Sequence, residues 1–200
     1  TVANAPAAIA PWGSHVPVFG TNPIAFAAPR KTWPPLVIDL SLSKVARGKV
    51  MVAAENGEAI PEGWALDAAG QPTTDPKAAL AGTMLPMGDA KGAALVLMVE
   101  VLAAALTGAR FGFEASSFFT AEGEPPGVGQ LIIALDTRFF AGGAFEERLD
   151  TLISAILSQQ GVRLPGSRRL TARKKAEANG IEVPEQLYAK LRDLACAKVE

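Results

Sequence analysis

Prolines and glycines crowd the first third of this chain, and they restrict its fold more than any other feature. Proline cannot donate the amide hydrogen bond that an interior strand needs, and glycine favours turns. The closely spaced positions are Pro6, Pro11, Gly13, Pro17, Gly20, Pro23, Pro29, Pro34 and Pro35. Only short strands fit between them, and we predict two, at Ile24 to Ala28 and at Leu36 to Ser41.

The second predicted strand alternates in polarity. Its apolar positions are Ile38, Leu40 and Leu42, and its polar positions are Asp39, Ser41 and Ser43. Successive strand residues point to opposite faces, so three small polar side chains share one face. This face could bind a polar ligand, and Lys44 or the N-terminus of the next helix could face a phosphate of that ligand. An ordinary solvent-facing strand that ends in a helix cap explains the same pattern.

Hydrophobic spacing predicts helices in much of the remaining chain. Val45 to Glu55 is the first, with Ser43 as its N-cap and Gly57 past its end. Lys91 to Gly108 is apolar almost all round, so we expect a central, buried helix. Gln130 to Asp136 is typical of a strand buried on both faces. Further helices are predicted at Phe145 to Gln160, at Arg168 to Asn179 and from Pro184 onward.

Charge and composition argue against several classes of function. A formal net charge of -1 gives no overall attraction to nucleic acid or anionic membranes. With one histidine and one cysteine, zinc ligation and Cys-His catalysis are not supported, and we expect no metal. A single cysteine cannot form an internal disulfide, which fits a cytoplasmic location. The longest apolar run, Ala93 to Leu106, is too short for a membrane span.

Two further segments have compositions suited to anions. GDAKGA, Gly88 to Ala93, places Lys91 between small residues at a helix start, although its spacing is not that of a P-loop. RLPGSRR, Arg163 to Arg169, has Gly166 and Ser167 at a turn before a basic helix, which suits a pyrophosphate or a 2'-phosphate. A plain helix start and a solvated helix face explain these patterns as well.

Other catalytic patterns are weak or missing. His15, in a proline-flanked loop, is interpreted as a surface residue rather than a general acid. There is no GxSxG nucleophile elbow, and no GxGxxG follows a strand. The sequence therefore indicates neither a serine hydrolase of that type nor a Rossmann dinucleotide site.

Five segments, in this order, resemble the malate/L-lactate dehydrogenase family of NAD(P)-dependent oxidoreductases. They are GTNPIAFAAPR, IDLSLSKVARGKV, IPEGWALDAAGQPTTDP, GDAKGAALVLMVEVL and RLPGSRR, and together they extend over essentially the whole chain. The family also contains ureidoglycolate, sulfolactate, diketogulonate and piperideine-carboxylate reductases. The resemblance implies an α/β (α+β) fold with a mixed, largely antiparallel sheet flanked by helices, and a homodimer.

The resemblance also implies site residues and domains. The cofactor-binding residues carried over are Ile38, Asp39, Leu40, Ser41, Leu42, Ser43, Lys44, Ala90, Lys91, Gly166, Ser167 and Arg168. Glu62 is a candidate for the substrate side. We expect a non-Rossmann cofactor domain over residues 1–142. Residues 143–200 are expected to form a helical region that packs on this domain or on a missing N-terminal domain.

The implied reaction moves a hydride between NAD or NADP and C2 of a small 2-hydroxy or 2-oxo acid, or of a cyclic imino acid. The family's proton-donating histidine is expected in a segment upstream of Thr1, and His15 does not match it. We therefore expect the chain to be a fragment of a longer enzyme. The alternative is a non-catalytic fragment that binds cofactor or dimerises without turnover.

Overall fold

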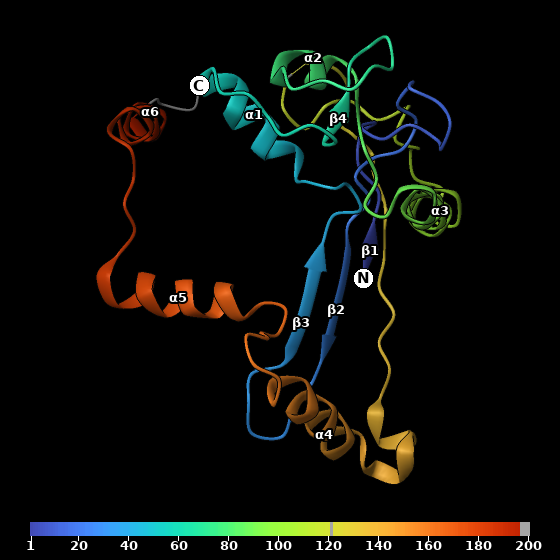
Figure 1. Cartoon of the computed structure of the whole chain (residues 1–200), viewed down its shortest axis with the longest axis vertical. Helices are drawn as coiled ribbons and strands as arrows, with labels where there is room; N and C mark the ends of the chain where they lie inside the picture. The colour runs from blue at the N-terminus through green and yellow to red at the C-terminus, as the bar shows by residue number, and fades with distance from the viewer. Residues whose placement is uncertain (121, 197–200) are drawn as a thin grey trace. The chain divides into compact units, whose positions relative to one another are not determined.

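The computed structural model describes residues 1–120 and 122–196 (Figure 1). The chain divides into two compact units, Thr1–Leu152 and Ile153–Glu200. The first unit contains a four-stranded sheet in the order β3-β2-β1-β6, and each neighbouring pair is antiparallel. Its strands are β1 (Val2–Ala3), β2 (Ile24–Ala28), β3 (Leu36–Leu40) and β6 (Gln130–Leu131). The predicted α/β fold with an antiparallel sheet is confirmed.

The hairpin of β2 and β3 is the longest part of the sheet. The two strands pair over five residues, from Ile24 opposite Leu40 to Ala28 opposite Leu36. β2 begins directly after Pro23 and ends directly before Pro29. Both predicted strands are confirmed. The prolines on either side of β2 limit it, because proline cannot donate the amide hydrogen bond of an interior strand.

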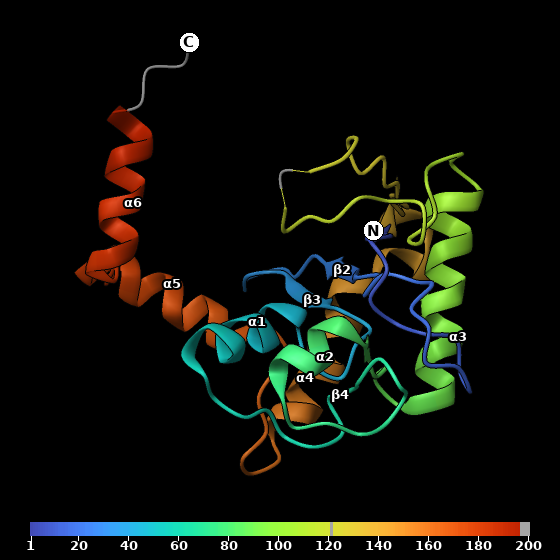
Figure 2. The same cartoon turned by 90° about the horizontal axis from the view of Figure 1, so that it is seen from above.

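Several short elements lie together in the first unit (Figure 2) and contribute residues to its main hydrophobic core. They are α1 (Arg47–Asn56), β4 (Ala65–Leu66), α2 (Pro76–Ala81) and β5 (Thr83–Met84). α2 begins with Pro76 after Asp75, whose side chain accepts a hydrogen bond from the Lys77 amide. The largest fully buried apolar side chains of this unit are Ile9, Leu42, Val50, Met84, Val96 and Val99.

Serine does not cap α1 as expected. The N-cap residue is Ala46, with no side-chain hydrogen bond, because the helix begins at Arg47 and leaves Ser43 outside its first turn. The Ser43 hydroxyl instead donates to the Val45 carbonyl at 2.7 Å. The other end follows the prediction. Gly57 takes the left-handed conformation there (φ 70°), and its amide bonds to the Ala53 carbonyl.

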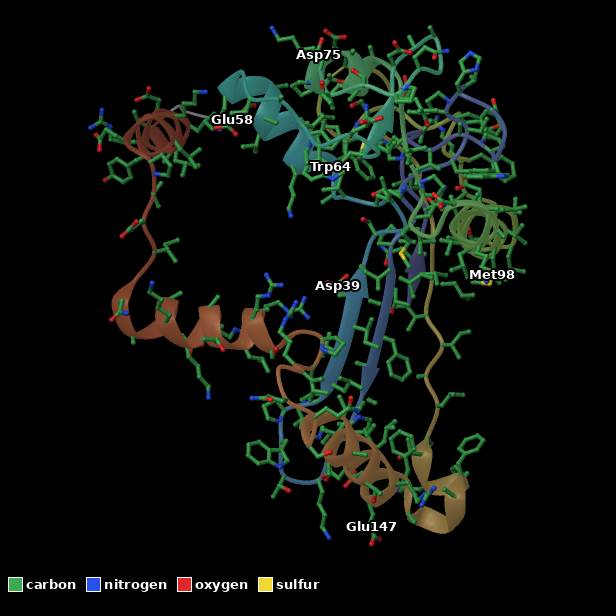
Figure 3. All side chains as sticks on the ribbon, in the orientation of Figure 1. Asp39, Glu58, Trp64, Asp75, Met98 and Glu147 are labelled. Carbon is green, nitrogen blue, oxygen red and sulfur yellow. The ribbon has the colours of Figure 1, made fainter. Side chains whose placement is uncertain are left out.

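Helix α3 (Asp89–Glu100) continues into a π-helical turn, Val101–Ala105. Its buried side is narrow, and we expected burial on nearly all sides. Leu97, Val101 and Leu106 are at least half exposed, and Met98 also lies on an open side (Figure 3). The spacing rule overestimated burial because the described part of this unit covers only one side of the helix.

The buried carboxylate of Glu100, at the end of α3, connects distant segments of the first unit. Its Oε1 accepts hydrogen bonds from the Gly112 amide at 2.6 Å and from Asn4 Nδ2 at 3.2 Å. Its Oε2 accepts from Asn22 Nδ2 at 2.7 Å. Asn22 belongs to the GTNP segment, so this segment has a structural role in connecting β2 to α3.

The expected strand over Gln130 to Asp136 is wrong for most of its length. Only β6, Gln130–Leu131, pairs with another strand among the described residues. Ile132, Ile133 and Leu135 are 69%, 68% and 71% exposed. Their apolar composition predicted burial, but β1 next to them is only two residues long.

Most of the described chain after Asp136 is helical. Two 3₁₀ turns, Thr137–Phe139 and Ala141–Gly143, lead into α4 (Phe145–Leu157). In the first unit, Arg30 Nε lies 2.8 Å from Asp150 Oδ1 and so ties the end of β2 to α4. The second unit contains α5 (Ser167–Asn179), which ends at Gly180 as predicted, and α6 (Glu185–Cys196).

Candidate functional site

The predicted polar row begins on β3 and continues past its end. Asp39 lies opposite Ala25 of β2 and is exposed (Figure 3). Ser41 is half-buried and Ser43 is buried, and their hydroxyl oxygens are 3.1 Å apart. The single hydroxyl proton of Ser43 is donated in a hydrogen bond to the Val45 carbonyl. Ser41 must therefore be the donor in the hydrogen bond between the two hydroxyls. The side chains of Asp39 and Ser41 therefore offer mainly acceptor oxygens.

The apolar residues of the same segment anchor it. Leu42 is buried in the core, and its amide donates to the Thr21 carbonyl at 2.8 Å. Ile38 is half-buried, and Leu40 is 37% exposed. The segment is thus fixed from one side while its polar row stays partly open.

Residues 42–44 lie directly beside residues 85–87. The Lys44 amide donates to the Leu85 carbonyl at 2.8 Å, and the Met87 amide donates to the Leu42 carbonyl at 2.8 Å. This pairing brings the end of the polar row to the start of α3. We call residues 39–44 together with residues 85–91 the strand–helix junction.

The start of α3 is reached through two left-handed residues, Gly88 (φ 67°) and Asp89 (φ 56°). Lys44 Nζ lies 3.3 Å from Asp89 Oδ1. The predicted residues Ala90 and Lys91 follow and are exposed in the first helical turn. Helix amides in this turn have no partner within the helix and carry partial positive charge. Two of the three predicted cofactor segments therefore meet at the junction.

The third predicted segment belongs to the second unit. Gly166 (φ 78°) precedes α5, and both the amide and the hydroxyl of Ser167 donate to the Leu164 carbonyl, at 3.3 and 2.8 Å. Arg168 is exposed in the first turn of α5. In the first unit, Glu62 lies exposed in the turn before β4, and its substrate role stays a prediction.

Sequence reasoning missed Arg47, the first residue of α1. Its Nη1 donates to the Ala7 carbonyl at 3.4 Å, and its Nη2 donates to the Leu80 carbonyl at 3.3 Å. Its Nε is buried and has no hydrogen-bond partner among the described residues. Burial lowers the pKa of Arg47, but a guanidinium remains charged at neutral pH. Arg47 as a whole is half-buried, and a cation with an unused donor is a candidate for binding an anion.

Arg47 lines a pocket of about 250 Å³. Thr21, Gly112, Phe113 and Phe118 line it as well. The Thr21 hydroxyl and the guanidinium are polar groups among aromatic and small residues, an arrangement common in small-molecule sites. The signal in the sequence was slight, because Lys44 and Lys49 on either side made Arg47 look like one more surface charge.

A larger cavity, of about 550 Å³, contains the only histidine. His15 is exposed there, as interpreted from sequence, and lines the cavity with Trp12 and Gln71. Gly70 (φ 80°) packs on the imidazole so closely that an added Cβ would lie 2.9 Å from the His15 Cβ. None of the residues that line this cavity is Lys, Arg, Asp or Glu. It is therefore less suited to an anionic substrate than the Arg47 pocket.

The described part of the chain offers neither a metal-binding cluster nor a membrane-spanning helix. No three His, Cys, Asp or Glu side chains gather there as a metal site. No helix in the same residues is long and apolar enough to cross a bilayer.

Comparison with known protein families extends the resemblance seen in the five segments. A family model described as malate/L-lactate dehydrogenase matches residues 1–192. The chain belongs to the malate/L-lactate dehydrogenase family. It is 59% identical over 196 residues to the (2R)-3-sulfolactate dehydrogenase (NADP(+)) of Chromohalobacter salexigens, covering 98% of this chain and 58% of that protein. It is 46% identical to the Delta(1)-pyrroline-2-carboxylate reductase of Pseudomonas fluorescens, covering 93% and 56%.

Solved structures of the malate/L-lactate dehydrogenase family share the fold. The delta1-piperideine-2-carboxylate reductase from Pseudomonas syringae superposes with a TM-score of 0.87 at 40% identity, over 96% of this chain and 58% of that one. The sulfolactate dehydrogenase from Methanocaldococcus jannaschii gives a TM-score of 0.84 at 34% identity, over 97% and 57%. The chain thus spans less than two thirds of the length of these relatives.

Proposed function

We propose that this protein is an NAD(P)-dependent oxidoreductase of small carboxylic acids. It transfers a hydride between a nicotinamide cofactor and C2 of a 2-hydroxy or 2-oxo acid, or of a cyclic imino acid. The observation that carries the proposal is the strand–helix junction, where Lys44 meets Asp89 at the start of α3. The similar proteins named for sulfolactate and pyrroline-2-carboxylate support a small carboxylate as substrate.

The residues of the junction fit the polar groups of a dinucleotide. Ribose hydroxyls need acceptors, and Asp39 and Ser41 present them. A pyrophosphate needs cations and amide donors, which Lys44, Lys91 and the first turn of α3 supply. When bound, the cofactor supplies the hydride, and the protein holds and orients it. The backbone that holds these groups in place includes the remaining predicted residues, Ile38, Leu40, Leu42, Ser43 and Ala90.

We propose that Gly166, Ser167 and Arg168 bind the adenosine end of the cofactor. Arg168 is exposed, and its planar guanidinium suits a 2'-phosphate. The name of the Chromohalobacter relative includes NADP(+), which supports NADP over NAD.

The Arg47 pocket is the proposed site for the substrate carboxylate. Arg47 provides a cation for charge-assisted hydrogen bonds, and Thr21 lines the same pocket. Phe113 and Phe118 add apolar surface to this partly open pocket, since both are more than half exposed. The pocket orients the acid while a proton donor and the cofactor act at C2.

We also propose a cytoplasmic homodimer without nucleic acid or membrane partners. Exposed apolar side chains on α3 and on the π-helical turn after it, such as Leu97 and Val101, support association of two copies. Residues 1–142 would form the cofactor-binding domain, and residues 143–200 a helical addition. Sedimentation equilibrium of the protein tests the dimer.

Oxidation of NADH and NADPH tests the proposed function. The assay uses pyruvate, oxaloacetate, 3-sulfopyruvate and Δ1-pyrroline-2-carboxylate, with this chain and with the full reading frame of its gene. Turnover of at least one of these substrates by the full reading frame is expected. Cofactor binding without turnover by this chain would match the alternative of a non-catalytic fragment. If neither protein oxidises either cofactor, the proposal is wrong.

A further inference from the structure

The ion pair of Lys44 and Asp89 lies at the point of the strand–helix junction where a phosphate of the proposed cofactor would bind. Lys44 Nζ is 3.3 Å from Asp89 Oδ1. Asp89 is the first residue of α3, where the helix dipole and amides without a helical partner favour a negative charge. A pyrophosphate needs these same two partners, an ammonium and a helix start. In this structure, the anion beside both of them is the Asp89 carboxylate.

The backbone beneath this ion pair is held in place by other contacts. The Lys44 amide donates to the Leu85 carbonyl and the Met87 amide to the Leu42 carbonyl, both at 2.8 Å. The first turn of α3 packs on residue 87 so closely that a Cβ added at Gly92 would collide with the Met87 carbonyl oxygen. An ion pair between exposed side chains adds little stability. The Lys44–Asp89 pair is therefore not needed to join the two segments.

The two charged side chains can separate without disturbing the core. The Lys44 side chain is 38% exposed, and that of Asp89 is 59% exposed. Water and salt weaken an ion pair at such a position. The space over the preceding turn is open as well, since a Cβ added at Gly88 would meet no atom within 4 Å. A phosphate can therefore approach Lys44 while the Asp89 side chain turns away.

The backbone of Asp89 points to a role for its side chain. Its φ of 56° is left-handed, a conformation that few residues other than glycine adopt. Glycine would take this conformation without strain, but it would leave Lys44 without the carboxylate. A strained residue at a binding site is a reason to examine what its side chain does there.

We propose that Asp89 is a positioning residue that acts through Lys44, as an internal counter-ion that the cofactor pyrophosphate displaces. The inference rests on the proposed cofactor role of the junction. Before binding, Asp89 holds the Lys44 ammonium at the start of α3. On binding, the ammonium exchanges the carboxylate for a phosphate oxygen, and no covalent bond changes. The exchange lowers the affinity for the cofactor and speeds its release.

Fluorescence titration of the full reading frame with NADPH tests the exchange. Asp89→Asn removes the charge, keeps the shape and suits the left-handed backbone. We expect a dissociation constant about fivefold lower, mainly through slower dissociation. The gain should fall below about twofold in roughly 0.5 M sodium chloride, because salt screens the exposed pair. The control is Asp193→Asn on α6, an exposed aspartate whose loss should leave NADPH binding unchanged.

A Lys44→Met background shows whether Asp89 acts through Lys44. There, Asp89→Asn should change the dissociation constant of NADPH by less than about twofold, because the pair is already broken. Equal tightening in both backgrounds would mean that Asp89 repels the phosphates directly, and would overturn the proposal. Weaker or unchanged NADPH binding by Asp89→Asn with Lys44 present would overturn it too.

Two further comparisons separate this inference from the proposed function and from misfolding. If the unmodified full reading frame binds neither NADPH nor NADH, the proposed cofactor role is wrong and the exchange is wrong with it. If it binds them and Asp89→Asn binds equally well, only the exchange is wrong. Asp89→Gly, which relieves the backbone strain, should tighten NADPH binding as Asp89→Asn does. Circular dichroism of both variants should match that of the unmodified protein.

Discussion

Asn22 Nδ2 lies 2.7 Å from Glu100 Oε2 in the interior of the first unit. The same amide nitrogen donates to the Val96 carbonyl at 3.0 Å, and Asn22 Oδ1 accepts from the Ala5 amide at 3.3 Å. Asn22 also has a left-handed backbone (φ 38°), which asparagine tolerates better than most residues. The GTNP segment is thus attached to α3 by a buried amide–carboxylate pair, and Thr21 beside it lines the Arg47 pocket.

Replacing Glu100 by glutamine should destabilise the protein although the shape is retained. Glutamine has one acceptor oxygen, so its NH₂ would face a donor of Asn22 or of Gly112. An unsatisfied buried pair of donors costs about 2 to 4 kcal/mol in the free energy of unfolding. Urea denaturation followed by circular dichroism measures this, with the exposed Glu55→Gln as the control. Equal midpoints for the two variants would contradict the role assigned to Glu100.

Replacing Thr21 by valine should weaken substrate binding while the fold is kept. The change removes the hydroxyl from the Arg47 pocket but conserves its volume, and the Thr21 carbonyl still accepts from the Leu42 amide. Loss of one hydrogen bond to a charged ligand corresponds to a KM about tenfold higher for the acid in the full-length enzyme. The KM for the cofactor should hardly change. A higher KM for the cofactor alone would contradict the proposal that this pocket binds the substrate.

Replacing Arg168 by alanine should weaken NADPH binding about tenfold or more and NADH binding little, because only NADPH has the 2'-phosphate. Fluorescence titration of both cofactors gives the two dissociation constants. The exposed Arg192→Ala in α6 controls for the loss of one positive charge. Equal losses for both cofactors would refute the preference for NADP.

Replacing Arg138 by glutamine should raise the pKa of Asp136. The Arg138 side chain hydrogen-bonds this carboxylate, with Nη2 2.6 Å from Oδ2, and so lowers the pKa of Asp136 below its ordinary value. A lowered pKa means that the pairing is complete above the ordinary pKa and is lost as the pH falls through the lowered one. NMR titration of the Asp136 carboxyl should show its midpoint moving to higher pH in this variant. Arg148→Gln should leave the midpoint unchanged.

Local signals in the sequence predicted the ends of several elements well. Prolines 23 and 29 limit β2, and Gly57 and Gly180 end their helices. These features act within a few residues, so one sequence is enough to find them. Burial was harder to predict. Leu97 and Ile133 are apolar but exposed, because their burial depends on what packs against them and not on their own spacing.

The candidate site shows the same difference between features that were predicted from local sequence and features that depend on distant residues. The polar row of Asp39 and Ser41 was visible as an alternation, and its approach to Lys91 was expected only from the family resemblance. Arg47 was missed because its burial comes from the backbones of Ala7 and Leu80, which are far from it in sequence. Ser43 was predicted to cap a helix that begins at Val45, but the helix begins at Arg47, so Ser43 lies before its N-cap.

The cofactor role of the strand–helix junction is tested most directly by NADPH titration of a lysine pair. Lys91 is exposed at the junction, and Lys77 is exposed on α2 away from it in sequence. Lys91→Ala should weaken NADPH binding about tenfold by fluorescence titration of the full reading frame, because it removes a cation from the pyrophosphate, whereas Lys77→Ala should bind as the unmodified protein does. Equal dissociation constants for the two variants would contradict a cofactor site at this junction.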